Sequence, residues 1–450
     1  MKRNSSNPVS YLFTENLNEG KIALYQPVPY GFKSITYGGL RDSVYEMAGV
    51  LKEKGVGPGD EVLIMLPFSI DMYVAVISVL ARGACAVFVE PWMKREIFRR
   101  VCKSIKGRFA ITSPAGKVFL RMMGLKKEFI RRGKGCGGDV LLGIENNFPA
   151  VITFTTGSSG IPTKVTRTYG ELFRQVDRLS RHIEDGDFVD FVMFPNLVLL
   201  NLYYMRSTLL PPRKLKKNFL KEEMERLSLD RLFISSSALP FAVDKEIGKR
   251  LHRIYTGGST IPTVFLESTG IINKTVIFYG CTQIEPISVV SGQEYVEWKG
   301  DGYYAGKIES DLEHRISFIE KDGGILYVRF PGENWVNTGD VVRIRKGEIE
   351  LLGRKMDLSI LNQRIIYPYV FQRMFEDTGR AIFPLAKENC LYIVVEGRRD
   401  LKLEKVIKTK SIEKTGINPG VVFMKKIPKD PRHGAKVDSR KLKKIVKNYL

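Results

Sequence analysis

The chain is poor in the residues that build metal centres and disulfide frameworks. Its histidines are far apart in the sequence, at His182, His252, His314 and His433, and no two have the spacing of ligands on one helix or hairpin. Its five cysteines stand singly, without the paired spacing of a zinc site. The sequence therefore predicts reduced thiols and no histidine-based metal centre. A divalent ion would have to enter with a phosphate ligand.

Uninterrupted apolar runs are also missing. The longest apolar stretches, 61–91 and 188–205, are broken by charged residues or proline, whereas a membrane span needs roughly 20 apolar residues in a row. The first residues, MKRNSSNPVS, carry two basic side chains but no apolar segment of a secretory signal. We expect a cytoplasmic protein of 450 residues, long enough for two or more domains.

Acidic residues are fewer than basic ones, and the formal net charge is therefore +22. The last fifty residues, 401–450, contain fifteen Lys or Arg and four Asp or Glu, so half of the excess lies there. One interpretation is a solvated basic surface with loose affinity for nucleic acid or anionic lipid. The other is a domain that closes over a polyphosphate.

The first half of the chain alternates short apolar runs with longer periodic stretches. The pattern predicts a helix over 40–51, a strand over 61–66, a helix over 70–80 and a strand over 84–89. A further strand, VITFTT from Val151, runs into a Gly/Ser loop that is followed by a helix over about 169–184. This order predicts an α/β fold with parallel sheet.

The second half changes character. The segments GILYVRF, WVNTGD and GEIELLG after Gly323 predict an antiparallel subdomain. Beyond Gly353 the composition turns basic, with strands at LYIVVEG and VVFMKKI, a helix over 401–415 and a last helix after Asp438. We therefore expect a large N-terminal domain of mixed sheets flanked by helices, residues 1–353. A small basic α+β domain, residues 354–450, would follow it as a lid.

A loop rich in hydroxyls follows the strand at Val151. The segment FTTGSSG places four hydroxyl side chains and two glycines in a short turn. Such a loop directs backbone N–H groups and hydroxyls at one anion. It differs from the G-x-x-x-x-G-K-[ST] phosphate loop, because its glycines are three positions apart and no Lys-Ser pair follows.

This loop resembles the TSGTTGxPKGV motif of the adenylate-forming superfamily, which includes acyl-CoA synthetases, peptide-synthetase adenylation domains and luciferases. Further segments match that superfamily in the same order, namely TGGSTIP at Thr256, FYGCTQIEPIS at Phe278, NTGD at Asn337, GRKMD at Gly353 and IPKDPRHGAKVDSRKL near the end. Within the superfamily the chain is most similar to the fatty-acid branch with the β-lactone synthetases of olefin biosynthesis. VEPWM, FPNLVLLNLYY and DPRHGAK carry that likeness.

The resemblance implies an ATP-dependent, Mg²⁺-requiring ligase that joins a medium- or long-chain fatty acid, with or without a 3-hydroxyl group, to AMP and releases pyrophosphate. The acyl group would then close to a lactone or pass to an acceptor, for which CoA is a candidate. One alternative is a fatty acyl-CoA ligase, and another is a nucleotide- or acyl-binding homologue with weakened catalysis. The partner is a small carboxylic acid, with no specific nucleic acid, no transmembrane segment and room for peripheral membrane contact.

The resemblance also assigns roles to residues. Tyr279 and Gly280 would lie along the adenine with Gly258 near them, Asp340 and Arg354 would meet the ribose, and Thr282 the α-phosphate. Lys436 would bridge the α-phosphate and the acyl carboxylate, with His433 beside it, while Gln283 and Glu285 would hold Mg²⁺. The β- and γ-phosphates would bind to Thr155, Thr156, Gly157, Ser158, Ser159 and Gly160, with charge added by Lys164.

Three positions depart from the superfamily pattern. The loop lysine of the family is replaced by Thr163, with Lys164 displaced by one, and the metal-binding glutamate by the neutral Gln283. At the hinge, Met356 stands where Asp or Lys is usual. Because Lys436, Asp340 and the loop hydroxyls are retained, we expect an active enzyme of altered geometry rather than an inactive one.

Overall fold

A computed structural model describes residues 7–89, 93–133, 140–141, 143–156, 162–320, 323–429 and 437–446. The contacts divide the chain into two compact units, 1–233 and 234–450. The expected boundary at Arg354 lies inside the second unit and stays a prediction. In the described part of the chain, no helix is both long and apolar enough to cross a bilayer.

The first unit contains the parallel sheet that the sequence predicts. Its strand order is β6-β5-β3-β4-β7-β8, and all neighbours are parallel except β7 and β8. Helices α3 and α4 cover one face, where Phe98 and Leu120 pack against Leu63, Val87 and Ile152. The elements are α1 (Tyr37–Glu53), β3 (Glu61–Met65), α2 (Ile70–Ala81), β4 (Cys85–Phe88), α3 (Arg95–Ser104), β5 (Phe109–Thr112), α4 (Pro114–Met122), β6 (Glu128–Ile130), β7 (Pro149–Thr156) and β8 (Pro162–Thr168).

One detail around the Gly/Ser loop differs from the sequence-based expectation. The chain does not pass directly from the loop into a helix, because β8 returns antiparallel to β7 before α5 (Tyr169–Ser180) begins. The β-branched residues Thr163, Val165 and Thr166 favour that strand. Thr168 then caps α5 in a capping box with Glu171. Antiparallel strands β7 and β8 therefore precede and follow the loop, and α5 begins only after β8.

A second group of strands in this unit has the order β11-β9-β10-β1-β2. Asp190 on β9 lies opposite Arg231 on the parallel strand β11, and both side chains are fully buried. The elements are a 3₁₀ turn (Ser10–Phe13), β1 (Ile22–Val28), β2 (Gly31–Thr36), β9 (Val189–Val192), α6 (Pro195–Tyr203), β10 (Ser207–Leu209), α7 (Phe219–Leu227) and β11 (Leu229–Ser235). Of the charged stretch 211–230, only α7 is helical.

The second unit begins with a parallel pair of strands and continues antiparallel. Its order is β16-β17-β18-β19-β15-β14-β13-β12, in which only β12 and β13 run parallel. The antiparallel subdomain expected after Gly323 is thus present. The elements are α8 (Leu239–Ala242), α9 (Lys245–Arg250), β12 (Arg253–Gly257), α10 (Thr263–Thr269), β13 (Thr275–Tyr279), β14 (Ser288–Ser291), α11 (Gly292–Glu297), β15 (Tyr303–Ile308), β16 (Glu313–Phe318), β17 (Gly324–Arg329), β18 (Val336–Arg345) and β19 (Glu348–Arg354).

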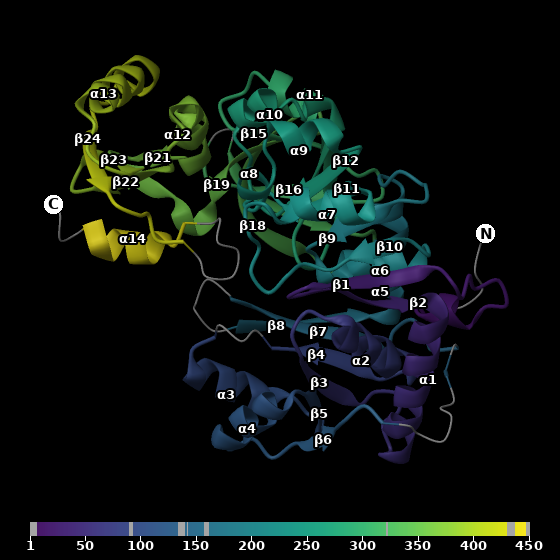
Figure 1. Cartoon of the computed structure of the whole chain (residues 1–450). Helices are drawn as coiled ribbons and strands as arrows, with labels where there is room; N and C mark the ends of the chain where they lie inside the picture. The colour runs from purple at the N-terminus through teal and green to yellow at the C-terminus, as the bar shows by residue number, and fades with distance from the viewer. Residues whose placement is uncertain are drawn as a thin grey trace. The chain divides into compact units, whose positions relative to one another are not determined.

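The C-terminal part of this unit forms a small layered structure. Its sheet, β22-β23-β24, lies between helices α12 and α13 on one side and α14 on the other (Figure 1). Helix α13 covers the predicted range because Asp400 caps its start and Gly416 ends it in the left-handed region. The elements are β20 (Ser359–Leu361), β21 (Arg364–Ile366), α12 (Pro368–Met374), β22 (Ile382–Lys387), β23 (Cys390–Glu396), α13 (Leu401–Thr415), β24 (Gly420–Met424) and α14 (Ser439–Val446).

Candidate functional site

The hydroxyl-rich loop joins two paired strands. Thr155 and Thr156 end β7 and lie opposite Thr163 and Pro162 of β8. Gly157, Ser158, Ser159 and Gly160 lie outside the described residues, and the structure describes only the backbone of Thr155 and Thr156. The phosphate-binding role of the loop stays a prediction.

Lys164, the residue expected to add charge beside this loop, already has an anionic neighbour. Its Nζ lies 2.8 Å from Oε1 of Glu61, whose side chain on β3 is only 11% exposed. The carboxylate partly neutralises the ammonium and holds it toward the first strand of the parallel sheet. Paired with Glu61, Lys164 is a poor substitute for the loop lysine of the family, whose position is occupied here by Thr163.

Three of the predicted nucleotide-binding residues lie together. Asp340 on β18 is directly opposite Arg354 on the antiparallel strand β19. The hydroxyl of Tyr279, at the end of β13, donates a hydrogen bond of 3.0 Å to Oδ2 of Asp340. Arg354 Nε lies 3.5 Å from Oδ1. The structure thus brings one carboxylate, one guanidinium and one aromatic ring into contact from three separate sequence motifs.

The electrostatics of this cluster favour one set of protonation states. Burial and the adjacent Asp340 carboxylate raise the pKa of Tyr279 well above its ordinary value, so the phenol stays protonated and acts as donor. For Arg354 burial opposes the charge, but Asp340, Tyr369 and Asp357 more than compensate and raise its pKa. The cluster therefore combines a neutral phenol donor with a guanidinium that keeps its positive charge, both beside the Asp340 side chain.

The cluster retains hydrogen-bonding capacity for a ligand. Nε of Arg354 is buried and makes no hydrogen bond to any residue that the structure describes. Asp340 is 17% exposed and offers further lone pairs on both carboxylate oxygens. The nearest acceptor of this Nε is Oδ1 of Asp340 at 3.5 Å, a long contact that leaves the N–H able to form a shorter hydrogen bond to a ligand. An acceptor and a donor side by side fit a diol such as the ribose of a nucleotide.

Glycines flank the cluster where the backbone must come close to a partner. At Gly280, directly after Tyr279, a Cβ atom would lie 2.9 Å from the carbonyl oxygen of Ile284, so a side chain would not fit without movement. Gly258, after β12, has φ of +89°, a conformation that side chains rarely adopt. Thr282 lies two residues beyond Gly280, half-buried in the same turn. These features fit close packing of a flat base, while the individual roles stay predictions.

The candidate metal ligands differ in accessibility. Gln283 is exposed and Glu285 is half-buried. Among the described residues, no group of three or more His, Cys, Asp or Glu side chains has the geometry of a metal site. The proposed catalytic pair, His433 and Lys436, lies outside the described residues.

Sequence reasoning missed one aromatic residue of this cluster. Tyr369 on α12 is raised in pKa by burial and by Asp340, with Arg354 acting in the opposite direction. It follows Arg354 by fifteen positions and belongs to no motif, so only the fold reveals that it is a neighbour. Its raised pKa keeps the phenol neutral, and its electrostatic coupling to Asp340 and Arg354 places it near the pair.

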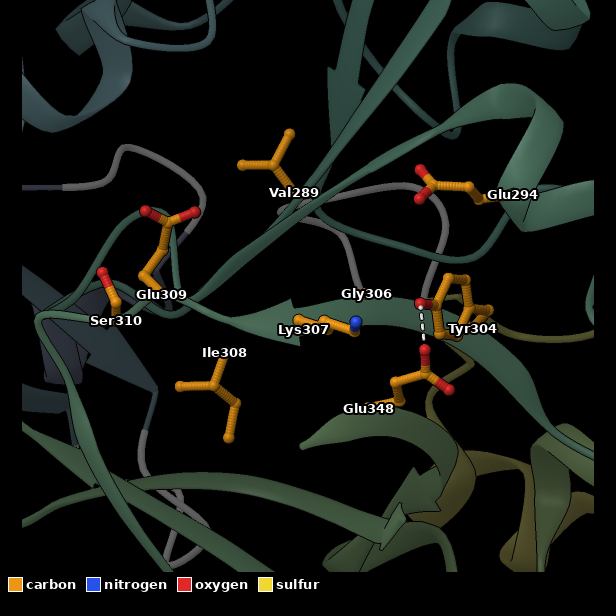
Figure 2. Close-up of a pocket in the computed structure, with 9 residues that line it drawn as sticks. All are labelled: Val289, Glu294, Tyr304, Gly306, Lys307, Ile308, Glu309, Ser310 and Glu348. Atoms are coloured by element: carbon orange, nitrogen blue, oxygen red, sulfur yellow. Dashed lines mark hydrogen bonds between the residues drawn. The ribbon is translucent and has the colours of Figure 1, made fainter. Parts of the chain in front are cut away.

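The second unit also contains a polar cavity of about 410 Å³ that includes none of these residues (Figure 2). In that view the hydroxyl of Tyr304 points to the carboxylate of Glu348, to which it donates a hydrogen bond of 3.4 Å. Glu294, Glu309 and Lys307 complete the charged lining. The cavity is thus distinct from the Tyr279–Asp340–Arg354 cluster.

Comparison with known sequences assigns the chain to one family. The model of the AMP-binding enzymes matches residues 14–316. Phenyloxazoline synthase MbtB of Mycolicibacterium paratuberculosis is 27% identical over 157 residues, which are 35% of this chain and 14% of that protein. The olefin beta-lactone synthetase of Stenotrophomonas maltophilia is 23% identical over 313 residues, 61% of this chain and 56% of that protein. The chain thus spans little more than half of one relative and a small part of the other.

Solved structures agree on the fold over almost the whole chain. The amide bond synthetase McbA from Marinactinospora thermotolerans has a TM-score of 0.81 at 17% identity, covering 98% of this chain and 99% of that one. The o-succinylbenzoate CoA synthetase of Bacillus subtilis, in complex with an acyl-adenylate intermediate, has a TM-score of 0.79 at 16% identity, covering 97% and 98%. The predicted fold class, a large N-terminal domain of mixed sheets with a small C-terminal domain, is confirmed.

Proposed function

Because this chain belongs to the family of AMP-binding enzymes, we propose that it uses ATP to convert a carboxylic acid into an acyl adenylate with release of pyrophosphate. The observation that carries the proposal is the meeting of Tyr279, Asp340 and Arg354, which come from three motifs and form one ribose-sized polar cluster. A carboxylate is a poor electrophile, and transfer to AMP gives its carbonyl carbon a good leaving group.

The residues divide this task between binding and charge stabilisation. Asp340 would accept hydrogen bonds from the ribose hydroxyls, and Arg354 would donate to the ribose through its unsatisfied Nε. Tyr279 holds the carboxylate in place and would offer its ring to the base. Negative charge develops on the α-phosphate and pyrophosphate, so the hydroxyl-rich loop, Thr282 and Lys436 would lower the barrier there. Mg²⁺, held with help from Glu285 and Gln283, would neutralise the phosphates.

For the acid we propose a medium- or long-chain fatty acid, including 3-hydroxy acids. The support is the likeness of the chain to an olefin beta-lactone synthetase and to that branch's motifs. An internal 3-hydroxyl would then displace AMP to close a lactone, whereas a CoA ligase would require a free thiol for the same step. The segment FPNLVLLNLYY, a candidate acyl wall, forms α6, in which Asn201 is fully buried and donates to Asp190. At least this part of α6 serves the core.

A binding protein with weakened catalysis is the second candidate. The pairing of Lys164 with Glu61 and the absence of a lysine at Thr163 favour it, because both reduce positive charge near the predicted phosphate loop. It predicts tight nucleotide binding with little turnover.

Acid-dependent exchange of pyrophosphate into ATP separates the candidates. The purified chain is incubated with ATP, Mg²⁺ and a panel of fatty and 3-hydroxy fatty acids, with and without CoA, and mass spectrometry identifies the products. We expect exchange only when acid is present. Lys436→Ala should slow it by about 10²–10³-fold, the usual loss of a charge at the reacting centre, whereas Lys441→Ala on the exposed side of α14 should not. AMP formation without acid, or equal rates in both variants, would contradict the proposal.

A further inference from the structure

The positive charge of the chain is concentrated in two segments. Residues 401–450 contain fifteen Lys or Arg and four acids, and residues 94–132 contain thirteen Lys or Arg and two acids. Each segment thus carries +11, and together they equal the formal net charge of +22, so the rest of the chain is balanced. Residues 94–132 are all described by the structure and form α3, β5, α4 and β6 of the first unit.

Helix α3 presents a row of cations, and its one acid, Glu96, forms no ion pair with any residue that the structure describes. Phe98, Val101 and Cys102 form its buried face, and Arg95, Arg99 and Lys103 repeat at four-residue spacing on its exposed side. With Arg100 they make no ion pair with any residue that the structure describes. Like charges at this spacing destabilise an isolated helix. An external anionic surface would relieve that repulsion.

The neighbouring helix α4 exposes apolar side chains beside this row. Val118 is 57% exposed, Phe119 37% and Met122 80%, and Val118 and Met122 are one helical turn apart. Helices α3 and α4 are neighbours (Figure 1), and the ring centroids of Phe98 on α3 and Phe119 on α4 are 5.2 Å apart. Arg121, on the same turn as Met122, is also exposed. Apolar side chains thus stand inside a strongly basic face.

The C-terminal basic segment is built differently. Several of its lysines are neutralised within the unit, and the exposed apolar residues of α13 are separated along the helix. The ion pairs join Lys408 to Glu404, Lys410 to Asp377 and Lys414 to Asp301. The two segments thus have the same net charge but different surfaces. Helix α13 therefore supplies matched control variants for helix α3.

From these observations we propose that the α3–α4 face, defined by Arg95, Arg99, Arg100, Lys103, Val118, Phe119, Arg121 and Met122, docks on bilayers that contain anionic phospholipid. Basic side chains around a few protruding apolar ones are typical of helices that lie in the lipid interface. The cations meet the headgroup phosphates, and Val118 and Met122 enter the acyl boundary. Nucleic acid would leave the apolar side chains against a polar backbone, so a bilayer fits this face better. The inference does not depend on the proposed reaction.

Vesicle co-sedimentation of the full chain tests the charges. The intact chain should bind phosphatidylcholine–phosphatidylserine vesicles and not vesicles of phosphatidylcholine alone. Because each cation near an anionic bilayer strengthens binding about fivefold, Arg99→Glu/Lys103→Glu should weaken binding by at least ~20-fold. Lys402→Glu/Lys405→Glu on α13 makes the same change of charge and should leave binding within about twofold. Unchanged thermal melting of both variants shows that they remain folded.

Insertion of the apolar residues tests the bilayer against other polyanions. In Met122→Trp the indole emission should shift to shorter wavelength on addition of anionic vesicles, and in Val406→Trp on α13 it should not. The inference is wrong if the intact chain does not bind anionic vesicles, or if the α3 and α13 charge variants lose vesicle binding equally. It is also wrong if the chain binds a DNA duplex more tightly than anionic vesicles and the indole emission of Met122→Trp does not shift on addition of the vesicles.

Discussion

Two Asp–Arg pairs of the described chain lie across neighbouring strands, in two different settings. Asp190 and Arg231 face each other across parallel strands of the first unit, and Asp340 and Arg354 across antiparallel strands of the second. The first pair is completely buried, and Arg231 binds both carboxylate oxygens at 2.7 and 2.8 Å. The second pair is partly exposed, with one contact of 3.5 Å.

The difference in burial indicates which of the two pairs can bind a ligand. Asn201 fills part of the remaining hydrogen-bonding capacity of Asp190, and the ring of Phe188 lies 4.2 Å from the Arg231 guanidinium. The second pair keeps an unsatisfied Nε on Arg354 and open lone pairs on Asp340. We infer that the first pair serves the fold and the second serves the reaction. The following experiments test this division.

Removing one member of the buried pair should have the largest effect. Asp190→Ala leaves the Arg231 charge buried without its partner, a change that typically costs about 3–5 kcal/mol of unfolding free energy. Denaturant unfolding measures it. The double variant Asp190→Leu/Arg231→Met should recover much of the loss, because no charge is then buried. If Asp190→Ala unfolds like the unaltered chain, the structural role is wrong.

Removing the exposed carboxylate should act on catalysis instead. Asp340→Ala is expected to lower kcat/KM for ATP by roughly 10- to 100-fold, since hydrogen bonds to a charged group contribute about 1.5–3 kcal/mol. Its unfolding free energy should fall by clearly less than that of Asp190→Ala, because the Asp340 and Arg354 side chains are 17% and 25% exposed and share one contact of 3.5 Å. Asp301→Ala, which removes the surface partner of Lys414, is the matched control and should retain activity. Equal losses of stability in Asp340→Ala and Asp190→Ala would remove the distinction.

A conservative change in the two arginines should separate them further. Arg354→Lys keeps the charge but loses the Nε donor, so we expect about a tenfold loss in kcat/KM for ATP with little change in melting temperature. Arg231→Lys cannot bind both oxygens of Asp190 and should instead lower the melting temperature. The opposite assignment of effects would contradict the comparison. Steady-state kinetics and thermal melting on both variants decide it.

The smallest expected effect concerns the donor to Asp340. Tyr279→Phe retains the ring and removes the 3.0 Å hydrogen bond, a loss of about 0.5–1.5 kcal/mol or roughly two- to tenfold in kcat/KM for ATP. Tyr304→Phe, which removes the longer bond to Glu348 at the separate cavity, is the control and should have no kinetic effect. A loss in Tyr279→Phe as large as in Asp340→Ala would give the hydroxyl a direct role.

Much of the fold could be predicted because local signals agreed with the final structure. Helix α13 has both an N-cap at Asp400 and a terminal glycine at Gly416, and it spans the predicted residues. Strand β8 was not predicted because its seven residues follow a Gly/Ser loop and are mostly polar, a composition that also fits an irregular segment. Its partner β7 supplies the ladder hydrogen bonds that stabilise it.

The candidate site was predicted only in part. Motif order pointed to Tyr279, Asp340 and Arg354, yet nothing in the sequence indicated that Glu61 pairs with Lys164 or that Tyr369 adjoins Arg354. The concentration of charge between residues 94 and 132 is visible in the sequence. Its exposure beside Val118 and Met122 is not, because exposure depends on which helix face the sheet covers.

The sequence alone determined the alternation of helices and strands, the order of the motifs and the excess of positive charge, since these depend on neighbouring residues and composition. Tertiary structure decided which Asp–Arg pair is buried and which meets solvent. Strand register places both pairs face to face, but the layers packed over β9 and β11 exclude water, whereas Asp340 and Arg354 remain partly exposed. Burial is a property of the whole packed chain, and it gives two pairs of the same residue types different access to a ligand.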